Sequence, residues 1–159
     1  MCSSDLLVGS SILNYVYYIK YNDTAKNLEQ TQQQLIAANN TNQGMENTMG
    51  VIQSKYTESV KLSGLPASPN SVAKVFWMKN TGEVYLDPSN LPTAPNGKQY
   101  QFWAIVDGKP VDGGLINSRA KAQIQKMKTF GRVEAFAITL ETAGGNPTPK
   151  GEMYVMGKL

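Results

Sequence analysis

Residues that could carry out catalysis are few in this sequence, and histidine is absent altogether. A serine nucleophile would then need another base, and the one candidate is a Ser118–Lys121 pair in a polar stretch that we expect to be an exposed connection. Glycoside hydrolysis needs two paired carboxylates, but no spacing singles out a pair. The carboxylates available are Asp87, Asp107, Asp112, Glu134 and Glu141. We therefore expect no enzymatic activity and no cofactor.

A metal site has equally little support. Asp107 and Asp112 lie beside glycines, but no calcium loop rich in aspartate is present. The single cysteine, Cys2, excludes an intrachain disulfide, and without histidine it leaves no set of zinc ligands. No glycine-rich phosphate loop precedes a helix. The sequence predicts no bound metal.

Aromatic side chains could instead form a platform for a sugar or a peptide. The candidates are Trp77, Tyr100, Phe102 and Trp103. In a small β domain such residues are usually core, because each buries about 150–250 Å². We expect them to pack inside the domain.

Glu141 and the loop that follows it favour a structural interpretation. A carboxylate beside Gly144 and Gly145 can accept hydrogen bonds from backbone N–H groups and so order the loop. The glycines permit positive φ, and Pro147 and Pro149 have no N–H to offer a neighbouring strand. The pattern predicts a loop built for shape.

The charge pattern does not indicate a nucleic-acid partner. The formal net charge is +3, and the lysines and arginines are scattered along the chain. A nucleic-acid footprint would gather them on one face.

An uncharged apolar run, residues 6–19, lies near the start of the chain. Its 14 residues would form a helix of about 21 Å. Tyrosines near its end are typical of a membrane interface. We expect residues 1–21 to form a transmembrane helix whose start is missing. The alternative is a buried or signal-like helix.

A seven-residue periodicity follows and predicts a helical stalk over residues 22–64. The expected seam positions are Leu28, Leu35, Asn42, Met45, Met49, Ile52 and Tyr56. Several of these are polar, so two interpretations stay open. One is a parallel coiled coil that forms a homodimer, and the other is a solvated helix or linker.

Short β-rich segments with Gly and Pro turns fill residues 65–159. The expected strands are 72–78, 83–86, 99–106, 111–116, 122–127, 132–141 and 152–156. About seven such strands predict a mainly β domain, an antiparallel, immunoglobulin-like β-sandwich preceded by the long N-terminal helix.

Several separate motifs in the C-terminal half, in this order and spacing, resemble the C-terminal domain of the anti-sigma-K factor family. They are Leu91-Pro92, the run 97–103, Gly108-Lys109-Pro110-Val111 with Gly113-Gly114, and Phe136–Glu141 followed by Gly144–Pro149. The positions that carry the resemblance are Leu91, Pro92, Tyr100, Trp103, Gly113, Gly114, Thr139, Glu141, Gly144, Gly145, Pro147 and Pro149.

The resemblance implies a place and a role. Members of that family bind a sigma factor through a cytoplasmic, zinc-associated helical domain, cross the bacterial inner membrane once, and place this domain outside it. Proteolysis of the outer domain and then of the membrane helix releases the sigma factor. We therefore expect a regulatory extracytoplasmic domain whose partners are the membrane and regulatory proteases.

Two further expectations follow. This sequence contains no sigma-binding domain, so we expect a sigma factor to be a partner only through a missing N-terminal domain. The alternative function is a membrane-tethered module that binds glycans or peptides.

Overall fold

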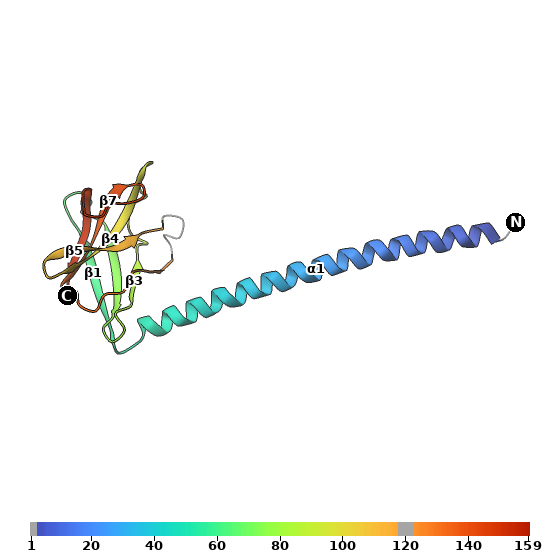
Figure 1. Cartoon of the computed structure of the whole chain (residues 1–159), viewed down its shortest axis with the longest axis horizontal. Helices are drawn as coiled ribbons and strands as arrows, with labels where there is room; N and C mark the ends of the chain where they lie inside the picture. Colours follow the sequence, from blue (N-terminus) through green and yellow to red (C-terminus); the bar gives the residue numbers. More distant parts are fainter. Residues whose placement is uncertain (1–2, 118–122) are drawn as a thin grey trace. The chain divides into compact units, whose positions relative to one another are not determined.

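A computed structural model describes residues 3–117 and 123–159, and the chain divides into two compact units, Met1–Asn47 and Thr48–Leu159. Helix α1, Ser3–Ile52, runs without interruption through the first unit and ends in the second (Figure 1). No helix of the described residues is both long and apolar enough to cross a membrane.

Four of the predicted seam side chains of helix α1 are exposed to solvent. Leu28, Leu35, Met45 and Met49 are each more than half exposed in the single chain. Gly44 and Gly50 lie inside the helix, where each costs about 1 kcal/mol relative to alanine. The helix therefore has little intrinsic support from its sequence and buries none of these four side chains.

The predicted stalk is too long at its C-terminal end. Helix α1 stops at Ile52, and Tyr56 lies in the turn before strand β1, Thr57–Gly64. The physical reason is a change of period: Val60 and Leu62 are buried while the residues between and beside them are exposed. This alternation is the pattern of a strand, and it begins where the predicted heptad seam ends, at Tyr56.

Eight strands lie in the described part of the second unit, where about seven were predicted. They are β1 Thr57–Gly64, β2 Val72–Met78, β3 Val84–Asp87, β4 Lys98–Val106, β5 Lys109–Leu115, β6 Gln125–Lys126, β7 Ala135–Thr142 and β8 Glu152–Lys158. Strand β2 has the predicted bounds, and β3, β4, β5, β7 and β8 differ from prediction by a few residues at their ends. Of the described residues in the segment predicted at 122–127, which are 123–127, the two of β6 are in a strand.

All eight strands form one antiparallel sheet with the order β5-β4-β7-β8-β1-β2-β3-β6. The mainly β, antiparallel prediction is therefore confirmed, whereas a two-sheet, immunoglobulin-like sandwich is not. Strand β1 explains the difference, because it pairs with β2 on one side and, through Ser63 and Gly64, with β8 on the other. Without β1 the remaining strands fall into two separate groups.

The two edges of this sheet meet, so it curls toward a closed barrel. The backbone N–H of Lys128, just after β6, donates to the carbonyl of Gly113 in β5 at 3.1 Å. The Lys128 Nζ atom also lies 2.5 Å from Asp112 Oδ2. Residues 112–113 and 128 thus join the edge strands, and closure of this kind removes exposed sheet edges.

The core lies inside the curled sheet. One face of each long strand supplies it, and the Phe102 and Phe136 rings stack there at 5.3 Å between centroids. The indole of Trp77 packs edge-on against Phe136 and donates to the carbonyl of Phe130. The predicted burial of the aromatic side chains is confirmed: Trp77, Tyr100 and Phe102 belong to this core, and Trp103 is buried on the opposite face of β4.

Candidate functional site

A buried carboxylate, Glu141, organises the outer face of the sheet at the end of β7. Only 1 % of Glu141 is exposed. It accepts hydrogen bonds from the backbone N–H groups of Lys150 at 3.1 Å and Gly151 at 2.9 Å, and from Asn146 Nδ2 at 2.7 Å. These donors all belong to loop 143–151, so Glu141 holds this loop onto the sheet. The predicted role for Glu141 is confirmed, although the donors are not Gly144 and Gly145.

Two neighbouring side chains extend this arrangement beneath the loop. Trp103 Nε1 on β4 donates to Thr139 Oγ1 on β7 at 2.8 Å, and Thr139 Oγ1 donates to Glu141 Oε1 at 2.6 Å. Trp103 and Thr139 are both about 1 % exposed. Each buried polar atom therefore has a partner, as buried polar groups require.

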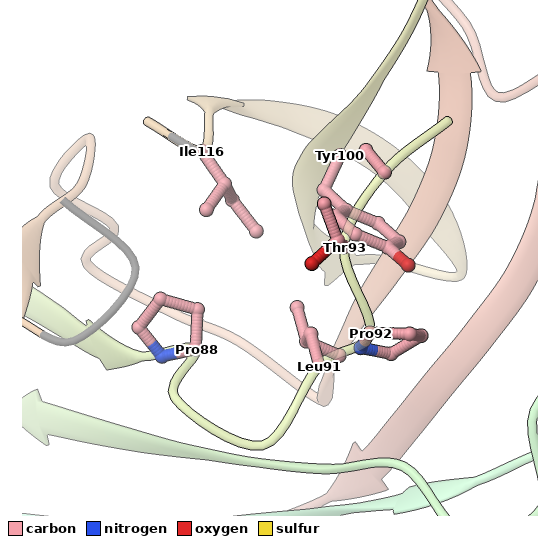
Figure 2. A pocket seen from close by; sticks show the side chains of 7 residues that line it. Pro88, Leu91, Pro92, Thr93, Tyr100 and Ile116 are labelled. Atoms are coloured by element: carbon pink, nitrogen blue, oxygen red, sulfur yellow. The ribbon is translucent and has the colours of Figure 1, made fainter. Parts of the chain in front are cut away.

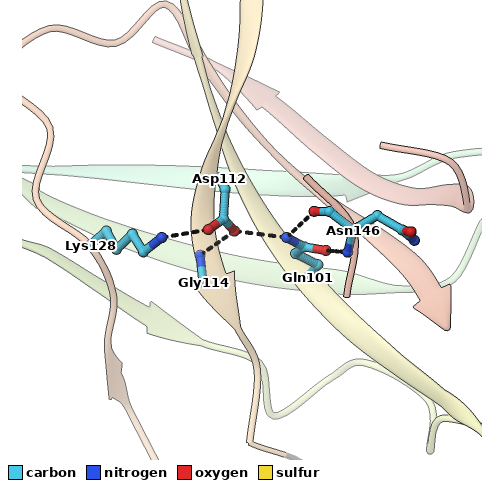
Figure 3. Close-up of polar contacts among 5 residues, drawn as sticks. All are labelled: Gln101, Asp112, Gly114, Lys128 and Asn146. Carbon is cyan, nitrogen blue, oxygen red and sulfur yellow. Dashed lines mark hydrogen bonds and ion pairs between the residues drawn. The ribbon is translucent and has the colours of Figure 1, made fainter. Parts of the chain in front are cut away.

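Gln101 connects the loop to the place where the sheet closes (Figure 3). Its amide exchanges two hydrogen bonds with the backbone of Asn146, at 2.9 and 2.8 Å, and its Nε2 also donates to Asp112 Oδ1 at 2.8 Å. Asp112 in turn accepts from the N–H of Gly114 and pairs with Lys128. We call the connected side chains of Trp103, Thr139, Glu141, Asn146, Gln101, Asp112 and Lys128 the polar network.

Both carboxylates of the polar network have lowered pKa values. Burial alone would raise the pKa of Glu141, but the hydrogen bonds from Thr139, Gly151, Lys150 and Asn146 outweigh it and hold the pKa below its ordinary value. The two carboxylates are therefore ionised at neutral pH and act as hydrogen-bond acceptors.

Asp112 follows the same balance. Burial would raise its pKa, but hydrogen bonds from Lys128, Gln101 and the N–H of Gly114 lower it overall. The Lys128 ammonium is itself largely exposed, so its ion pair contributes little to stability. Asp112 therefore contributes to stability chiefly by accepting hydrogen bonds from Gln101 and from the N–H of Gly114.

This difference gives a testable prediction. Asp112→Ala is expected to lower the free energy of unfolding by about 2 kcal/mol, because it removes acceptors from two partly buried donors. Lys128→Met keeps the aliphatic stem and the backbone bond to Gly113, and is expected to cost about 0.5 kcal/mol. Urea denaturation of both variants measures the two values. Equal losses would contradict this assignment.

The glycines of the resemblance occupy positions that a side chain would disturb. A Cβ on Gly113 would lie 2.4 Å from the Phe102 ring. Gly145 has φ +75° and approaches the Gln101 side chain, where a Cβ would lie 2.7 Å from Oε1. Gly114 and Gly144 also have positive φ. Gly144 and Gly145 therefore shape the loop, as predicted, and Gly113 and Gly114 shape the sheet edge.

An open groove of about 450 Å³ lies along the polar network. It is lined by Gln101, Asp112, Gly114, Leu115, Lys128, Gly144, Gly145, Asn146 and Pro147. Pro149, further along the loop, is half-buried. The groove brings together motif residues from β4, β5 and loop 143–151.

A second hollow lies near the start of β4, on the opposite face of the sheet from the groove and under the proline-rich connection (Figure 2). It measures about 50 Å³ and is lined by Pro88, Leu91, Pro92, Thr93, Ala94, Tyr100 and Ile116. Tyr100 packs edge-on against Tyr154, and none of the described residues forms a hydrogen bond with the buried Tyr100 hydroxyl. Burial, with a smaller contribution from Tyr154, raises the pKa of Tyr100 to about 12.

The unpaired hydroxyl predicts an unusual stability effect. Tyr100→Phe is expected to raise the free energy of unfolding by about 1 kcal/mol, because it removes a buried polar group that gains nothing from the fold. The ring contacts with Tyr154 are retained. Thermal and urea denaturation measure the change. A loss of stability would mean that the hydroxyl has a partner in solution.

The catalytic candidates are not gathered into one site. Asp107 pairs with Arg132 at 3.6 Å, Glu134 accepts from the N–H of Gly108, and Asp87 accepts from that of Ser89. The Ser118–Lys121 pair lies outside the described residues. Among the residues that are described, no three His, Cys, Asp or Glu side chains are grouped as a metal site would require.

Sequence reasoning gave no role to Gln101, Asn146 or Lys128. A signal for Gln101 was available, since it is a polar residue on the same face of the predicted central strand as Trp103 and Ile105. Asn146 and Lys128 reach the polar network only through the folding of loop 143–151 and the closure of the sheet.

The fold and this site together define a class of protein: a curled antiparallel β domain, following a long helix, whose buried polar groups hold a loop in place. Comparison with known families identifies the class more closely. Residues 6–153 match the family described as anti-sigma-K factor rskA, C-terminal, and the chain belongs to this family. Comparisons with curated proteins and with solved structures give no match.

Proposed function

We propose that this chain is the extracytoplasmic regulatory region of a membrane-bound anti-sigma factor, and that it controls the release of a sigma factor through regulated proteolysis. The observation that carries the proposal is the family match, which includes most of α1 and the β domain up to β8. Membership points to a regulatory role in the anti-sigma system, with a sigma factor as the general partner. The location and the proteolytic control are the proposed parts.

A membrane location is supported by the uncharged run at residues 6–19. In α1 the described side chains of this run are exposed, including Ile12, Leu13, Val16 and Ile19. Exposed aliphatic side chains on a single helix gain from contact with a hydrocarbon phase. We propose that this run anchors the chain at the bacterial inner membrane and that the β domain lies outside the cytoplasm.

Proteolytic control is supported by the contrast between the two units. In α1 the side chains at Leu28 and Leu35 are exposed, whereas the β domain closes its sheet edges and holds loop 143–151 through Glu141. Proteases need an unfolded segment, so a closed domain is resistant until it opens. We propose that the domain has no catalytic role and acts as a folded block to cleavage.

Location is tested with the chain carrying a C-terminal epitope tag in a bacterial host. We expect the chain in the membrane fraction and the epitope to be digested when protease is added to intact spheroplasts. A cytoplasmic protein serves as the control for lysis. Recovery of the chain in the soluble fraction, or protection of the epitope until lysis, would refute the proposed location.

Regulated cleavage is tested by comparing turnover in cells. Glu141→Ala is expected to shorten the lifetime of the chain, while Glu152→Ala, an exposed residue opposite Leu140, is expected to leave it unchanged. Pulse-chase labelling gives both lifetimes. Equal lifetimes would mean that destabilising the domain does not speed up its cleavage. This result would argue against the proposal that the folded domain blocks proteolysis.

A homodimer is the second part of this proposal. The exposed seam of α1 and the weak helical propensity around Gly44 and Gly50 favour a second helix as support. Sedimentation of the chain in mild detergent is expected to give a dimer, and Leu35→Asp is expected to give a monomer. A monomeric wild-type chain would leave the helix solvated, which is the alternative interpretation.

The groove along the polar network supports one other function, a glycan- or peptide-binding module. Lys128 Nζ borders this groove and has N–H groups beyond its bond to Asp112. A glycan array probed with the full chain tests this function. Binding that Lys128→Met abolishes would support it, and uniform absence of binding would reject it.

A further inference from the structure

The turn before strand β4 contains the one asparagine–glycine pair in the sequence, Asn96-Gly97. Both residues are exposed. Glycine has no Cβ to shield its backbone nitrogen, so this nitrogen can reach the side-chain amide of the preceding asparagine. The two groups are held next to each other in one chain, which favours their reaction over a reaction between separate molecules. The pair is therefore a candidate for chemical modification.

The backbone nitrogen of Gly97 is available for this reaction. Among the residues that the structure describes, none accepts a hydrogen bond from the Gly97 N–H. Gly97 has φ +76°, and a Cβ built on it would meet no heavy atom within 4 Å. The turn is closed by the next residue, because the N–H of Lys98 donates to the carbonyl of Pro95 at 3.0 Å. The exposed side chain of Asn96 thus has room to turn toward the Gly97 nitrogen.

Two comparable pairs in the β domain lack this freedom. Asn90 is exposed, but the N–H of Leu91 after it donates to a backbone carbonyl at 3.0 Å, and Leu91 carries a branched side chain. Asp107-Gly108 also contains a glycine, but the Gly108 N–H donates to Glu134 Oε2 at 3.2 Å. An ionised carboxylate is also a poorer electrophile than an amide. Asn96-Gly97 combines an amide, a glycine and an unengaged N–H.

Gly97 also connects this turn to the loop that Glu141 holds. The Gly97 carbonyl accepts a hydrogen bond at 2.9 Å from the N–H of Ala143, the first residue of loop 143–151. The pairing of β4 with β7 begins next to this bond, at Lys98 and Thr142. A change in the backbone at residue 96 therefore acts on a contact between the turn and the loop.

We propose that Asn96 is a site of spontaneous deamidation that yields isoaspartate, and that this product weakens the hydrogen bond between Gly97 and Ala143. The Gly97 nitrogen loses its proton to solvent base and attacks Asn96 Cγ. A C–N bond forms there, and the side-chain nitrogen takes up a proton and leaves as ammonia. Water then opens the resulting succinimide at either carbonyl, which gives aspartate or isoaspartate.

Isoaspartate changes the backbone as well as the charge. The main chain then runs through the former side chain of Asn96 and is longer by a methylene group. The turn that Pro95 and Lys98 close no longer has its original geometry, so the Gly97 carbonyl moves relative to Ala143. This inference does not depend on the proposed function.

Mass spectrometry of the full chain, incubated at mildly alkaline pH and then digested with trypsin, tests the modification. Fragmentation of peptide 80–98, which contains both Asn90 and Asn96, is expected to show NH₂ replaced by OH at Asn96 and an unchanged Asn90. The rate is expected to rise with pH, because the Gly97 nitrogen must lose its proton. Asn96→Gln, which would have to close a larger ring, is expected to give no product. No change at Asn96, or an equal change at Asn90, would overturn the proposal.

The effect on the loop is measured by hydrogen exchange. The modified chain is separated by ion-exchange chromatography, and methyl transfer by an isoaspartyl methyltransferase identifies its isoaspartate. We expect the Ala143 amide to exchange about tenfold faster in this form, the effect of losing about one hydrogen bond. Unchanged exchange at the buried Val155 establishes that the domain is still folded.

Asn96→Asp separates the backbone change from the charge. This variant carries the same added charge on an unaltered backbone, so its Ala143 amide is expected to exchange at the wild-type rate. Equally fast exchange in Asn96→Asp and in the isoaspartyl form would assign the effect to charge. That result, or wild-type exchange of Ala143 in the isoaspartyl form, would overturn the proposed effect on the loop.

Discussion

Glu141→Ala is expected to lower the free energy of unfolding by about 3 kcal/mol, one of the two largest effects that the structure predicts. The carboxylate accepts hydrogen bonds from Thr139, Asn146, Lys150 and Gly151, and the substitution leaves these donors without an acceptor. Loop 143–151 also loses its attachment to the sheet. Urea and thermal denaturation of the full chain measure the loss.

Two other substitutions make the result specific. Glu152→Ala removes an exposed carboxylate from the neighbouring strand and is expected to change stability by less than about 0.5 kcal/mol. Glu141→Gln keeps the size of the side chain but turns an NH₂ group toward backbone donors, so an intermediate loss of about 2 kcal/mol is expected. If Glu141→Ala were no less stable than Glu152→Ala, Glu141 would not organise the loop.

The lowered pKa of Glu141 also gives the chain a sensitivity to acid. Its pKa is lower in the folded chain than in the unfolded chain, where glutamate has a pKa of about 4.3. The stability that this group contributes is complete above the unfolded value and is lost as the pH falls through the folded value. The wild-type urea midpoint is expected to fall with pH below about 4 more steeply than that of Glu141→Gln. Parallel curves would contradict this linkage.

The course of most strands could be predicted from local chemistry. Strand β4 was recognisable because apolar residues occupy both of its faces, with Phe102 in the core and Trp103 on the opposite side. The hairpin from β4 to β5 was marked by Asp107-Gly108, where both residues have positive φ. Such signals depend on neighbours in the sequence, so they can be read without the fold.

Strand β1 could not be separated from the helix by the same means. The heptad spacing of Leu28 and Leu35 continues by chance to Tyr56, and the alternation at Val60 and Leu62 is only a few residues long. What makes this segment a strand is its pairing with β2 across seven residue pairs. That pairing is a tertiary contact, which outweighs a weak local pattern.

Only part of the polar network could be predicted from the sequence. Glu141 and the loop after it could be interpreted from their own sequence, because a carboxylate, two glycines and two prolines lie close together. The hydrogen bonds of Gln101 to Asn146 and to Asp112 depend on the pairing of β4 with β7 and with β5. Lys128 joins this network only because the sheet closes.

Gly151→Ala is expected to cause the second of the two largest losses in the free energy of unfolding. A Cβ at this position would lie 1.9 Å from the carbonyl oxygen of Leu140, which is backbone and cannot rotate away. The loop must shift, and the N–H groups of Lys150 and Gly151 then move off Glu141. We expect a loss of about 3 kcal/mol, at the upper end of the range for overpacking.

A matched glycine and a double variant decide the cause of that loss. Gly131 is exposed, has no heavy atom within 4 Å of a built Cβ and no positive φ, so Gly131→Ala is expected to be neutral. If Gly151→Ala acts by pulling the loop from Glu141, it will cost less in the Glu141→Ala background than in the wild type, by at least about 1 kcal/mol. Strict additivity would mean that the clash with Leu140 acts without disturbing the hydrogen bonds to Glu141, and the loop would then be held chiefly by packing.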